Sequence, residues 1–188
     1  MRVYLRDISQ VYTQSDQSLI RNVYVYPTTE FNLPKTKILR VVMPLYGLAE
    51  SGAHWFETYH KHHLNKLDMV QSTFDPCLLI EKTGRGLVGL QTDDSLILAD
   101  DTFAAREQEQ LTFLSKPRQQ LTSTDPIWFN GAVLNLDVDG SIAIRQPKQV
   151  TRIELLRGPD EYINQRARGA YLATVSQPER AFAYSFIA

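Results

Sequence analysis

The chain has almost no cysteine, no long apolar run and no excess of either charge. Cys77 is the single cysteine among 188 residues, so no internal disulfide can form, which suits a reducing intracellular compartment, cytoplasmic or nuclear. No apolar run reaches the length that spans a bilayer, and we expect neither a signal peptide before Met1 nor a membrane partner. With 20 basic and 21 acidic residues, the chain also lacks the basic balance typical of proteins that hold nucleic acid.

What is present is the composition of a single folded domain. Hydrophobic residues make up 43% and charged residues 22% of the chain, which is enough to bury a core, and there is no long linker or repeat. From residue 145 onward, seven basic residues stand against four acidic ones. The basic residues are Arg145, Lys148, Arg152, Arg157, Arg166, Arg168 and Arg180. This stretch is the best candidate for contacts with a nucleic-acid backbone, and scattered surface charge is an equally good interpretation.

Two adjacent acids, Asp93 and Asp94, lie between the apolar runs 86–90 and 96–99, which predicts a β-hairpin with carboxylates at its tip. Such a tip can bind divalent metal ions if a neighbouring strand adds one more carboxylate. Asp7 is a candidate for this third ligand, because the alternation before it predicts a strand that ends there and turns into a helical segment. An isolated aspartate is usually a solvated surface residue, and Asp94 alone could cap a turn, so spacing does not decide.

Several segments, in order, resemble the reverse transcriptase of copia-type long-terminal-repeat retrotransposons. Residues 6–12 resemble its first palm motif, an aspartate followed five residues later by an aromatic residue, and Leu45-Tyr46-Gly47-Leu48 within 44–56 resembles the segment that leads into its second. Gln91-Thr92-Asp93-Asp94 stands where the family carries its Tyr-x-Asp-Asp box. Smaller matches lie at residues 74–78, 129–131, 168–174 and 177–179. The resemblance therefore covers nearly the whole chain.

The resemblance implies an RNA-directed DNA polymerase that adds deoxynucleotides to a primer 3′-hydroxyl with two Mg²⁺ ions, or Mn²⁺. Its partners would be an RNA or DNA template with a primer and deoxynucleoside triphosphates. Asp7 and Asp93 would bridge the metals, and Asp94 would be a weaker ligand or a structural partner in the turn. Tyr12 would pack under the nucleotide sugar and exclude a 2′-hydroxyl. Without the motif, Tyr12 would be interpreted as an aromatic residue of a small core.

Two substrate-site positions depart from the family pattern. Gln91 replaces a tyrosine, so the hairpin tip keeps hydrogen-bonding groups and loses a flat aromatic surface. Glu50 replaces a glutamine, and its carboxylate would repel an incoming triphosphate unless it points away. Thr92 also replaces an apolar residue. Variation within the family and decay of an unselected copy explain these departures equally well.

Periodicity predicts helices and antiparallel strands along the rest of the chain. The expected elements are a helix over residues 50–67, a helix over 102–116, a strand over 128–138 and a hairpin turn at 139–140 into a strand over 141–144. The first helix carries four histidines, which we interpret as a solvated or partly packed cluster rather than a metal site: His54, His60, His62 and His63. Asp100 and Asp101 are expected to cap the second helix, and Cys77 to be a buried apolar residue before a strand.

These observations predict an α+β fold, a polymerase palm with an antiparallel sheet backed by helices and with incomplete fingers and thumb. We expect one domain over 1–188, with a palm core over about 1–145 and a connection or early thumb over about 146–188. In the family, basic residues that grip the triphosphate precede the first palm aspartate, and here only six residues do. We therefore expect a palm-centred fragment of a longer polyprotein, inactive without its other domains. The alternatives are a truncated, catalytically inactive remnant that folds and can bind nucleic acid, and another metal-dependent nucleotidyl transferase, against which Leu-Tyr-Gly-Leu argues.

Overall fold

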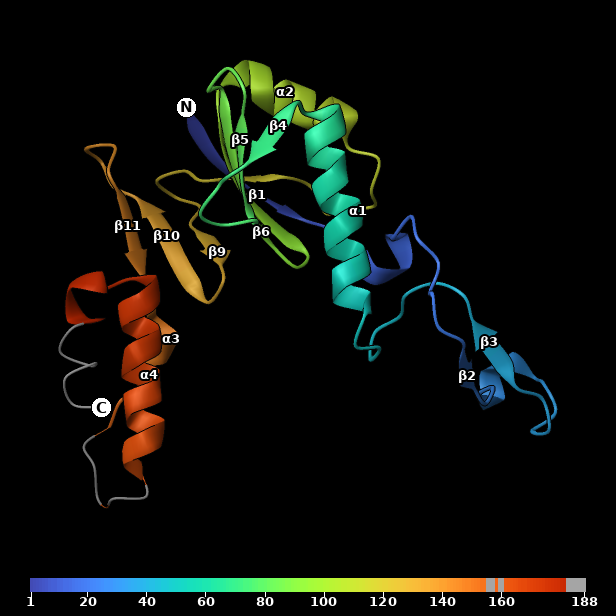
Figure 1. Cartoon of the computed structure of the whole chain (residues 1–188). Coiled ribbons are helices and arrows are strands. Elements are labelled where there is room, and N and C mark those ends of the chain that lie inside the picture. The colour runs from blue at the N-terminus through green and yellow to red at the C-terminus, as the bar shows by residue number, and fades with distance from the viewer. Residues whose placement is uncertain (155–157, 159–160, 182–188) are drawn as a thin grey trace. The chain divides into compact units, whose positions relative to one another are not determined.

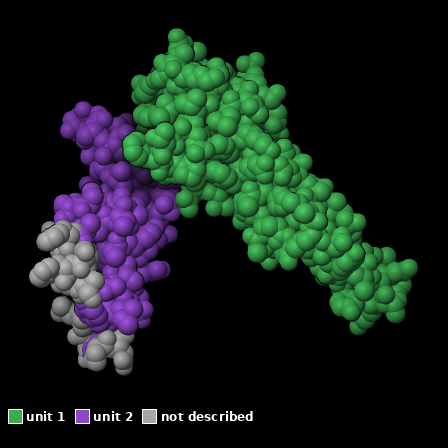
Figure 2. Space-filling view, in the orientation of Figure 1, with its two compact units in different colours: residues 1–118 green, residues 119–188 purple. Residues whose placement is uncertain are grey.

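The computed structural model describes residues 1–154, 158 and 161–181 (Figure 1). The chain divides into two compact units, residues 1–118 and residues 119–188 (Figure 2). The predicted palm core over about 1–145 and connection or thumb over about 146–188 stay predictions, because compactness does not assign a function to either unit. In the described residues, no helix is both long enough and apolar enough to span a bilayer.

The first unit is built on an antiparallel sheet. Five strands of this unit lie in it in the order β4-β5-β6-β7-β1, so β1 and β7 are neighbours although they come from opposite ends of the unit's sequence. Their bounds are β1 Arg2–Asp7, β4 Met69–Gln71, β5 Leu78–Glu81, β6 Gly86–Gln91 and β7 Asp94–Ala99. The β6–β7 hairpin confirms the predicted hairpin with the acidic pair at its tip.

Two helices, α1 Ser51–Lys66 and α2 Asp101–Gln110, lie beside this sheet (Figure 1). They share one hydrophobic core with it. Trp55 and Tyr59 of α1 and Phe103 of α2 pack in the same buried cluster as Val88 and Ile97 of the sheet. Gly86 allows α2 to approach closely, because a Cβ atom at this glycine would lie 2.4 Å from the Phe103 ring. The core therefore fixes both helices against the sheet.

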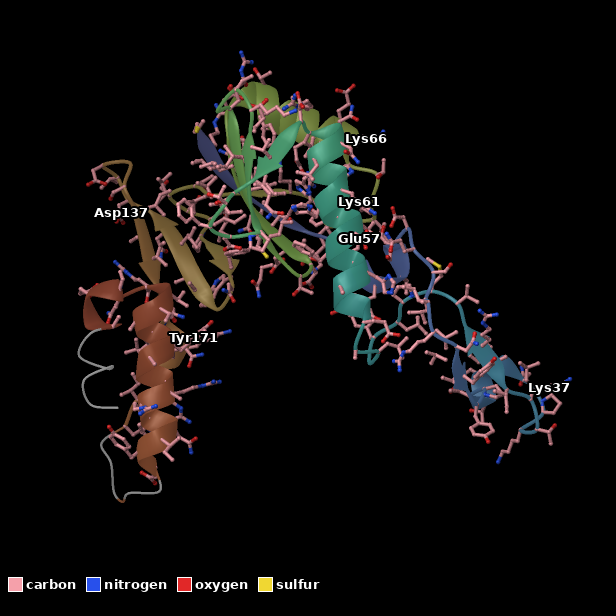
Figure 3. All side chains as sticks on the ribbon, in the orientation of Figure 1. Lys37, Glu57, Lys61, Lys66, Asp137 and Tyr171 are labelled. Atoms are coloured by element: carbon pink, nitrogen blue, oxygen red, sulfur yellow. The ribbon has the colours of Figure 1, made fainter. Side chains whose placement is uncertain are left out.

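Helix α1, Ser51–Lys66, confirms the helix predicted over residues 50–67. Its outer side carries Glu57, Lys61 and Lys66, with a Glu57–Lys61 ion pair of 2.7 Å (Figure 3). Three of the four histidines are buried: His54, His62 and His63. Burial lowers the pKa of His63 to about 4, and its Nδ1 lies 2.8 Å from the Tyr59 carbonyl oxygen. The histidine cluster is therefore packed rather than solvated, with a neutral imidazole donating at His63.

Helix α2, Asp101–Gln110, is shorter than the helix predicted over residues 102–116. Its capping is confirmed for Asp100, whose carboxylate accepts a 2.7 Å hydrogen bond from the Phe103 backbone N–H. The prediction was wrong beyond Gln110, where Leu111 turns the backbone to an extended conformation. The reason lies at the end of β1: Ser115 pairs with Ile8, and the Lys116 N–H donates to the Asp7 carbonyl at 2.9 Å. These backbone bonds compete successfully with another helical turn.

Residues 23–41 form elements that periodicity did not predict. The 3₁₀ turn η1, Val11–Gln14, leads to a two-stranded ribbon of β2, Val23–Val25, and β3, Leu39–Val41, with the turn η2, Thr29–Phe31, between them. Large apolar side chains on this ribbon are exposed, including Tyr24, Tyr26, Phe31 and Ile38. The helical turn expected after Asp7 is confirmed as η1.

The second unit begins with β8, Gln119–Gln120, and contains a three-stranded antiparallel sheet in the order β11-β10-β9. Its strands are β9 Ile127–Phe129, β10 Ala132–Leu136 and β11 Ile142–Arg145. The turn at Asn130 and Gly131, both with positive φ, splits the single strand predicted over residues 128–138. Helices α3 Pro147–Val150 and α4 Tyr162–Val175 and the turn η4 Pro178–Arg180 follow. Asp160, the Arg157 and Arg180 side chains and the thumb-like residues 184–188 lie outside the described part.

Candidate functional site

The pairing of β1 with β7 brings Asp7 to the acidic hairpin tip. Asp7 is the register partner of Asp94, and the Ile8 N–H donates a 2.8 Å hydrogen bond to the Asp93 carbonyl. Asp94 is also the register partner of Gln91 across the hairpin. The structure therefore places the three predicted carboxylates at one end of the sheet.

The pKa of Asp94 is raised by its surroundings at this end of the sheet. Burial raises the pKa of Asp94 to about 6, and repulsion from Asp93 and Asp7 adds to the effect, while Lys116 opposes it. Lys116 places its Nζ 2.6 Å from Asp7 Oδ2. The bond to Asp7, together with the charges of all three acids, raises the pKa of Lys116 in turn. We call the three carboxylates, Asp7, Asp93 and Asp94, the acidic cluster, and Lys116 is bound to it.

The acidic cluster has the donor chemistry of a magnesium site, because all its acceptor groups are carboxylate oxygens. Its side chains are not arranged as a finished site: among the described residues, no three His, Cys, Asp or Glu side chains lie together in a way that could hold a metal ion. The residue types and their repulsion fit a divalent cation, and at least one carboxylate must turn before three can share one ion.

Replacing Asp94 with asparagine should stabilise the protein in EDTA at pH 8 by about 1 kcal/mol and leave it unchanged near pH 4. Its pKa in the folded state, about 6, lies above the ordinary 3.8, so folding favours the protonated form. This stability is present below pH 4 and is lost as the pH rises through 6. The expected gain is smaller than the full effect of this pKa difference, because Asp94 is half-buried and water screens its charge.

Urea denaturation of wild type and Asp94→Asn at both pH values measures this difference. Asp139 is the control, because its hydrogen bonds with Ser141 lower its pKa, so Asp139→Asn should give no gain at pH 8. A constant difference between wild type and Asp94→Asn across pH would contradict the prediction.

Helix α1 supports the hairpin tip directly. The Trp55 indole N–H donates a 2.6 Å hydrogen bond to the Thr92 carbonyl, and the Tyr59 hydroxyl lies 2.9 Å from Ser95 Oγ. Thr92 has a positive φ of 51°, the left-handed conformation that the tight turn requires. The turn that carries Asp93 is therefore tied to the buried face of α1.

A cavity of about 250 Å³ lies between the start of α1 and the hairpin tip. It is lined mainly by apolar and aromatic side chains: Tyr12, Gly52, Trp55, Phe56, Tyr59, Cys77, Leu90, Gln91 and Thr92. Tyr12 is half-buried and packs against Tyr46, with ring centroids 4.6 Å apart. Cys77 is half-buried as well, which corrects the expectation of a fully buried residue. Two of the predicted substrate-site residues, Tyr12 and Gln91, thus share one cavity wall.

The third predicted substrate-site residue, Glu50, does not line this cavity. It precedes α1, and its carboxylate binds the Arg21 guanidinium through two hydrogen bonds of 2.5 and 2.8 Å. The hydrogen bond from Arg21 lowers the pKa of Glu50, so the carboxylate is ionised and its charge is compensated. The expected repulsion of a triphosphate is correspondingly reduced.

The chain is similar to retrotransposon polyproteins. It is 28% identical over 101 residues to the transposon Ty1-NL2 Gag-Pol polyprotein of Saccharomyces cerevisiae, a match that covers 54% of this chain and 6% of that protein. It is 27% identical over 101 residues to the truncated transposon Ty1-A Gag-Pol polyprotein of the same yeast, covering 54% and 8%. The chain thus spans less than a tenth of these relatives. No family model matches it. The similarity supports a retrotransposon origin.

Two cations beside the candidate site, Lys116 and Arg6, are not predicted by the sequence. Lys116 closes the predicted helix over 102–116, and no local pattern distinguishes a lysine there from one that reaches Asp7. Arg6 is a charged residue of the predicted strand, yet its side chain is 1% exposed and binds Glu107, which is 3% exposed, through hydrogen bonds of 3.0 and 2.8 Å. Arg118 adds a second guanidinium at 2.8 Å from Glu107. This ion network anchors the end of β1 next to Asp7.

Proposed function

We propose that the acidic cluster is the catalytic centre of an RNA-directed DNA polymerase from a retrotransposon polyprotein. The observation that carries this proposal is the register of β1 with β7, which sets Asp7 opposite Asp94 and beside Asp93 although they are distant in the chain. The resemblance of the motifs around these aspartates to copia-type enzymes, and the similarity to Ty1 polyproteins, support it.

In this proposal Asp7 and Asp93 would hold two Mg²⁺ or Mn²⁺ ions, and Asp94 would bind weakly or stabilise the turn. When bound, such ions activate the primer 3′-hydroxyl and neutralise the leaving pyrophosphate. The chain's own contribution is rigidity: β1 is held by the Arg6–Glu107 pair, and the hairpin tip by Trp55. This fixes the backbone from which the carboxylates project.

The fold supports a palm assignment for the first unit, since it is an antiparallel sheet backed by two helices with acids at strand ends. We propose that the exposed apolar side chains of the ribbon, Tyr24, Tyr26, Phe31 and Ile38, pack against other domains of the polyprotein. Basic residues of the second unit could contact a template and primer, although Lys148 already lies over the Trp128 ring at 5.0 Å. An intracellular site of action, cytoplasmic or nuclear, follows from the proposed activity.

Tyr12 is proposed to exclude ribonucleotides, because its ring lines the cavity beside the hairpin tip. Replacing Tyr12 with valine should increase the incorporation of ribonucleotides relative to deoxynucleotides by about tenfold to a hundredfold, since space for the 2′-hydroxyl is created. The ratio of kcat/KM for the two nucleotide types measures this effect. Tyr46→Val, which removes the ring packed on Tyr12, is the control and should change the ratio less. An unchanged ratio in Tyr12→Val would refute the role of Tyr12.

A catalytically inactive remnant is the second candidate. Three observations favour it. The Lys116 ammonium is bound to the Asp7 carboxylate, and no finished three-ligand metal site is present among the described residues. Gln91 also lacks the aromatic ring that the family motif carries at this position. Such a remnant would keep the fold and could still bind nucleic acid.

Primer extension on a polyribonucleotide template separates these candidates. The whole chain is supplied with a DNA primer, deoxynucleotides and Mg²⁺, with and without an added fingers segment from a related element, and Asp93→Asn and EDTA serve as blanks. The polymerase proposal expects extension that both blanks abolish. Fluorescence anisotropy measures binding of the same template and primer. If wild type and Asp93→Asn are equally inert while nucleic acid binds, the remnant is the correct description.

A further inference from the structure

We propose that Lys116 is a built-in counter-cation of the acidic cluster, and that a divalent ion binds Asp7 only by displacing the Lys116 ammonium. This inference rests on the proposed function, because it concerns the ion that the same cluster would take. The Lys116 Nζ lies 2.6 Å from Asp7 Oδ2, which is the position of a direct ion pair.

The backbone holds Lys116 at this place. The Lys116 N–H donates to the Asp7 carbonyl at 2.9 Å, and the Ser9 N–H donates to the Leu114 carbonyl at 2.9 Å. Ser115 forms an antiparallel bridge with Ile8. Residues 114–116 therefore continue alongside the end of β1, and the lysine stays within reach of Asp7 whether or not its ammonium is bound.

Exposure makes the ion pair replaceable. The Lys116 side chain is 68% exposed and that of Asp7 is 29% exposed, so the ammonium can leave Asp7 and be hydrated by water. The neighbouring Arg6–Glu107 pair, exposed by only 1% and 3%, has no such freedom. The two pairs at the end of β1 thus have different roles, one exchangeable and one fixed.

The balance of charge favours replacement by a divalent ion. The three carboxylates of the acidic cluster face one ammonium, that of Lys116, and negative charge is left over after the ion pair forms. A divalent cation compensates more of this charge from one position than a lysine does.

Binding of Mn²⁺ to the whole chain, measured by electron paramagnetic resonance at low ionic strength, tests the inference. Lys116→Met should lower the Kd by about threefold to tenfold, because the competing charge is gone. Lys116→Arg should resemble wild type, since it keeps the charge. Lys82→Met is the matched control: Lys82 forms an exposed ion pair of 2.5 Å with Asp68, and its loss should leave the Kd unchanged. Lys116→Gln is a second neutral variant should Met impair folding.

The possible failures are distinguishable. Equal Mn²⁺ affinity in wild type, Lys116→Met and Lys116→Gln would overturn the inference and leave the proposed function intact. If Asp93→Asn binds Mn²⁺ as well as wild type does, the ion is not held by the acidic cluster, and the proposed function and this inference both fail. If Lys82→Met lowers the Kd as much as Lys116→Met does, the effect comes from the net charge of the protein and not from Lys116 at Asp7. This result would overturn the inference.

Discussion

Replacing Glu107 with alanine should lower the free energy of unfolding by about 3–5 kcal/mol. Glu107 accepts hydrogen bonds from Nε and Nη2 of the buried Arg6 guanidinium and from Nη1 of Arg118. Without the carboxylate, the Arg6 guanidinium is left buried with only the Gln108 side-chain oxygen as a partner among the bonds observed. An unpaired buried charge is far more unfavourable than the intact pair is favourable, so removal of one partner has a large effect.

Urea denaturation of the whole chain measures this loss, and a Trp128→Phe background leaves Trp55 of the first unit as the fluorescent reporter. Glu109→Ala is the matched control, because Glu109 is an exposed glutamate on the same helix, and its effect should stay within about 0.5 kcal/mol. The double variant Arg6→Met with Glu107→Leu should recover most of the stability, since both charges are then absent. A Glu107→Ala protein as stable as Glu109→Ala would show that solvent reaches Arg6.

Local sequence was sufficient for the elements whose signals are local. The β6–β7 hairpin follows from two apolar runs around an acidic turn, and α1 follows from apolar residues at three- and four-residue steps. The helix cap at Asp100 follows from residue type alone. The meeting of Asp7 with Asp93 depends on the pairing of β1 with β7, which periodicity cannot specify. The predicted strand end makes Asp7 a candidate ligand, and the motif resemblance selects it.

The remaining errors come from long-range contacts that override local preference. In β1 the alternation suggests Val3 and Leu5 as the inner face, yet Tyr4 and Arg6 are the buried residues. The exchange is possible because Glu107, from a distant helix, neutralises Arg6, and Arg118 lies over the Tyr4 ring at 4.3 Å. The early end of α2 has the same origin, since residues 114–116 satisfy backbone groups at the end of β1. No window of sequence contains these partners.

Asp93→Asn should reduce primer extension by about a thousandfold, a loss of about 4 kcal/mol of transition-state stabilisation. Asparagine has nearly the same shape and can occupy the same turn, but it removes the charge that would hold the ions. Because the acids of the cluster repel one another, the substitution should not destabilise the metal-free protein. A loss of activity without a loss of stability is therefore the result that distinguishes a metal-binding role from a structural one.

Single-turnover extension measures the activity and urea denaturation in EDTA measures the stability of wild type and each variant. The extension assay uses the condition, with or without the added fingers segment, under which wild type extends the primer. Asp139→Asn is the matched control, because Asp139 is also an aspartate at the tip of a hairpin, and its bonds with Ser141 survive the change to asparagine. Its activity should equal that of wild type. The Kd for Mn²⁺ should rise at least about tenfold in Asp93→Asn and stay unchanged in Asp139→Asn. This binding measurement tests the same carboxylate without relying on turnover. If Asp93→Asn extends the primer as well as wild type does, the carboxylate at the hairpin tip has no role in catalysis.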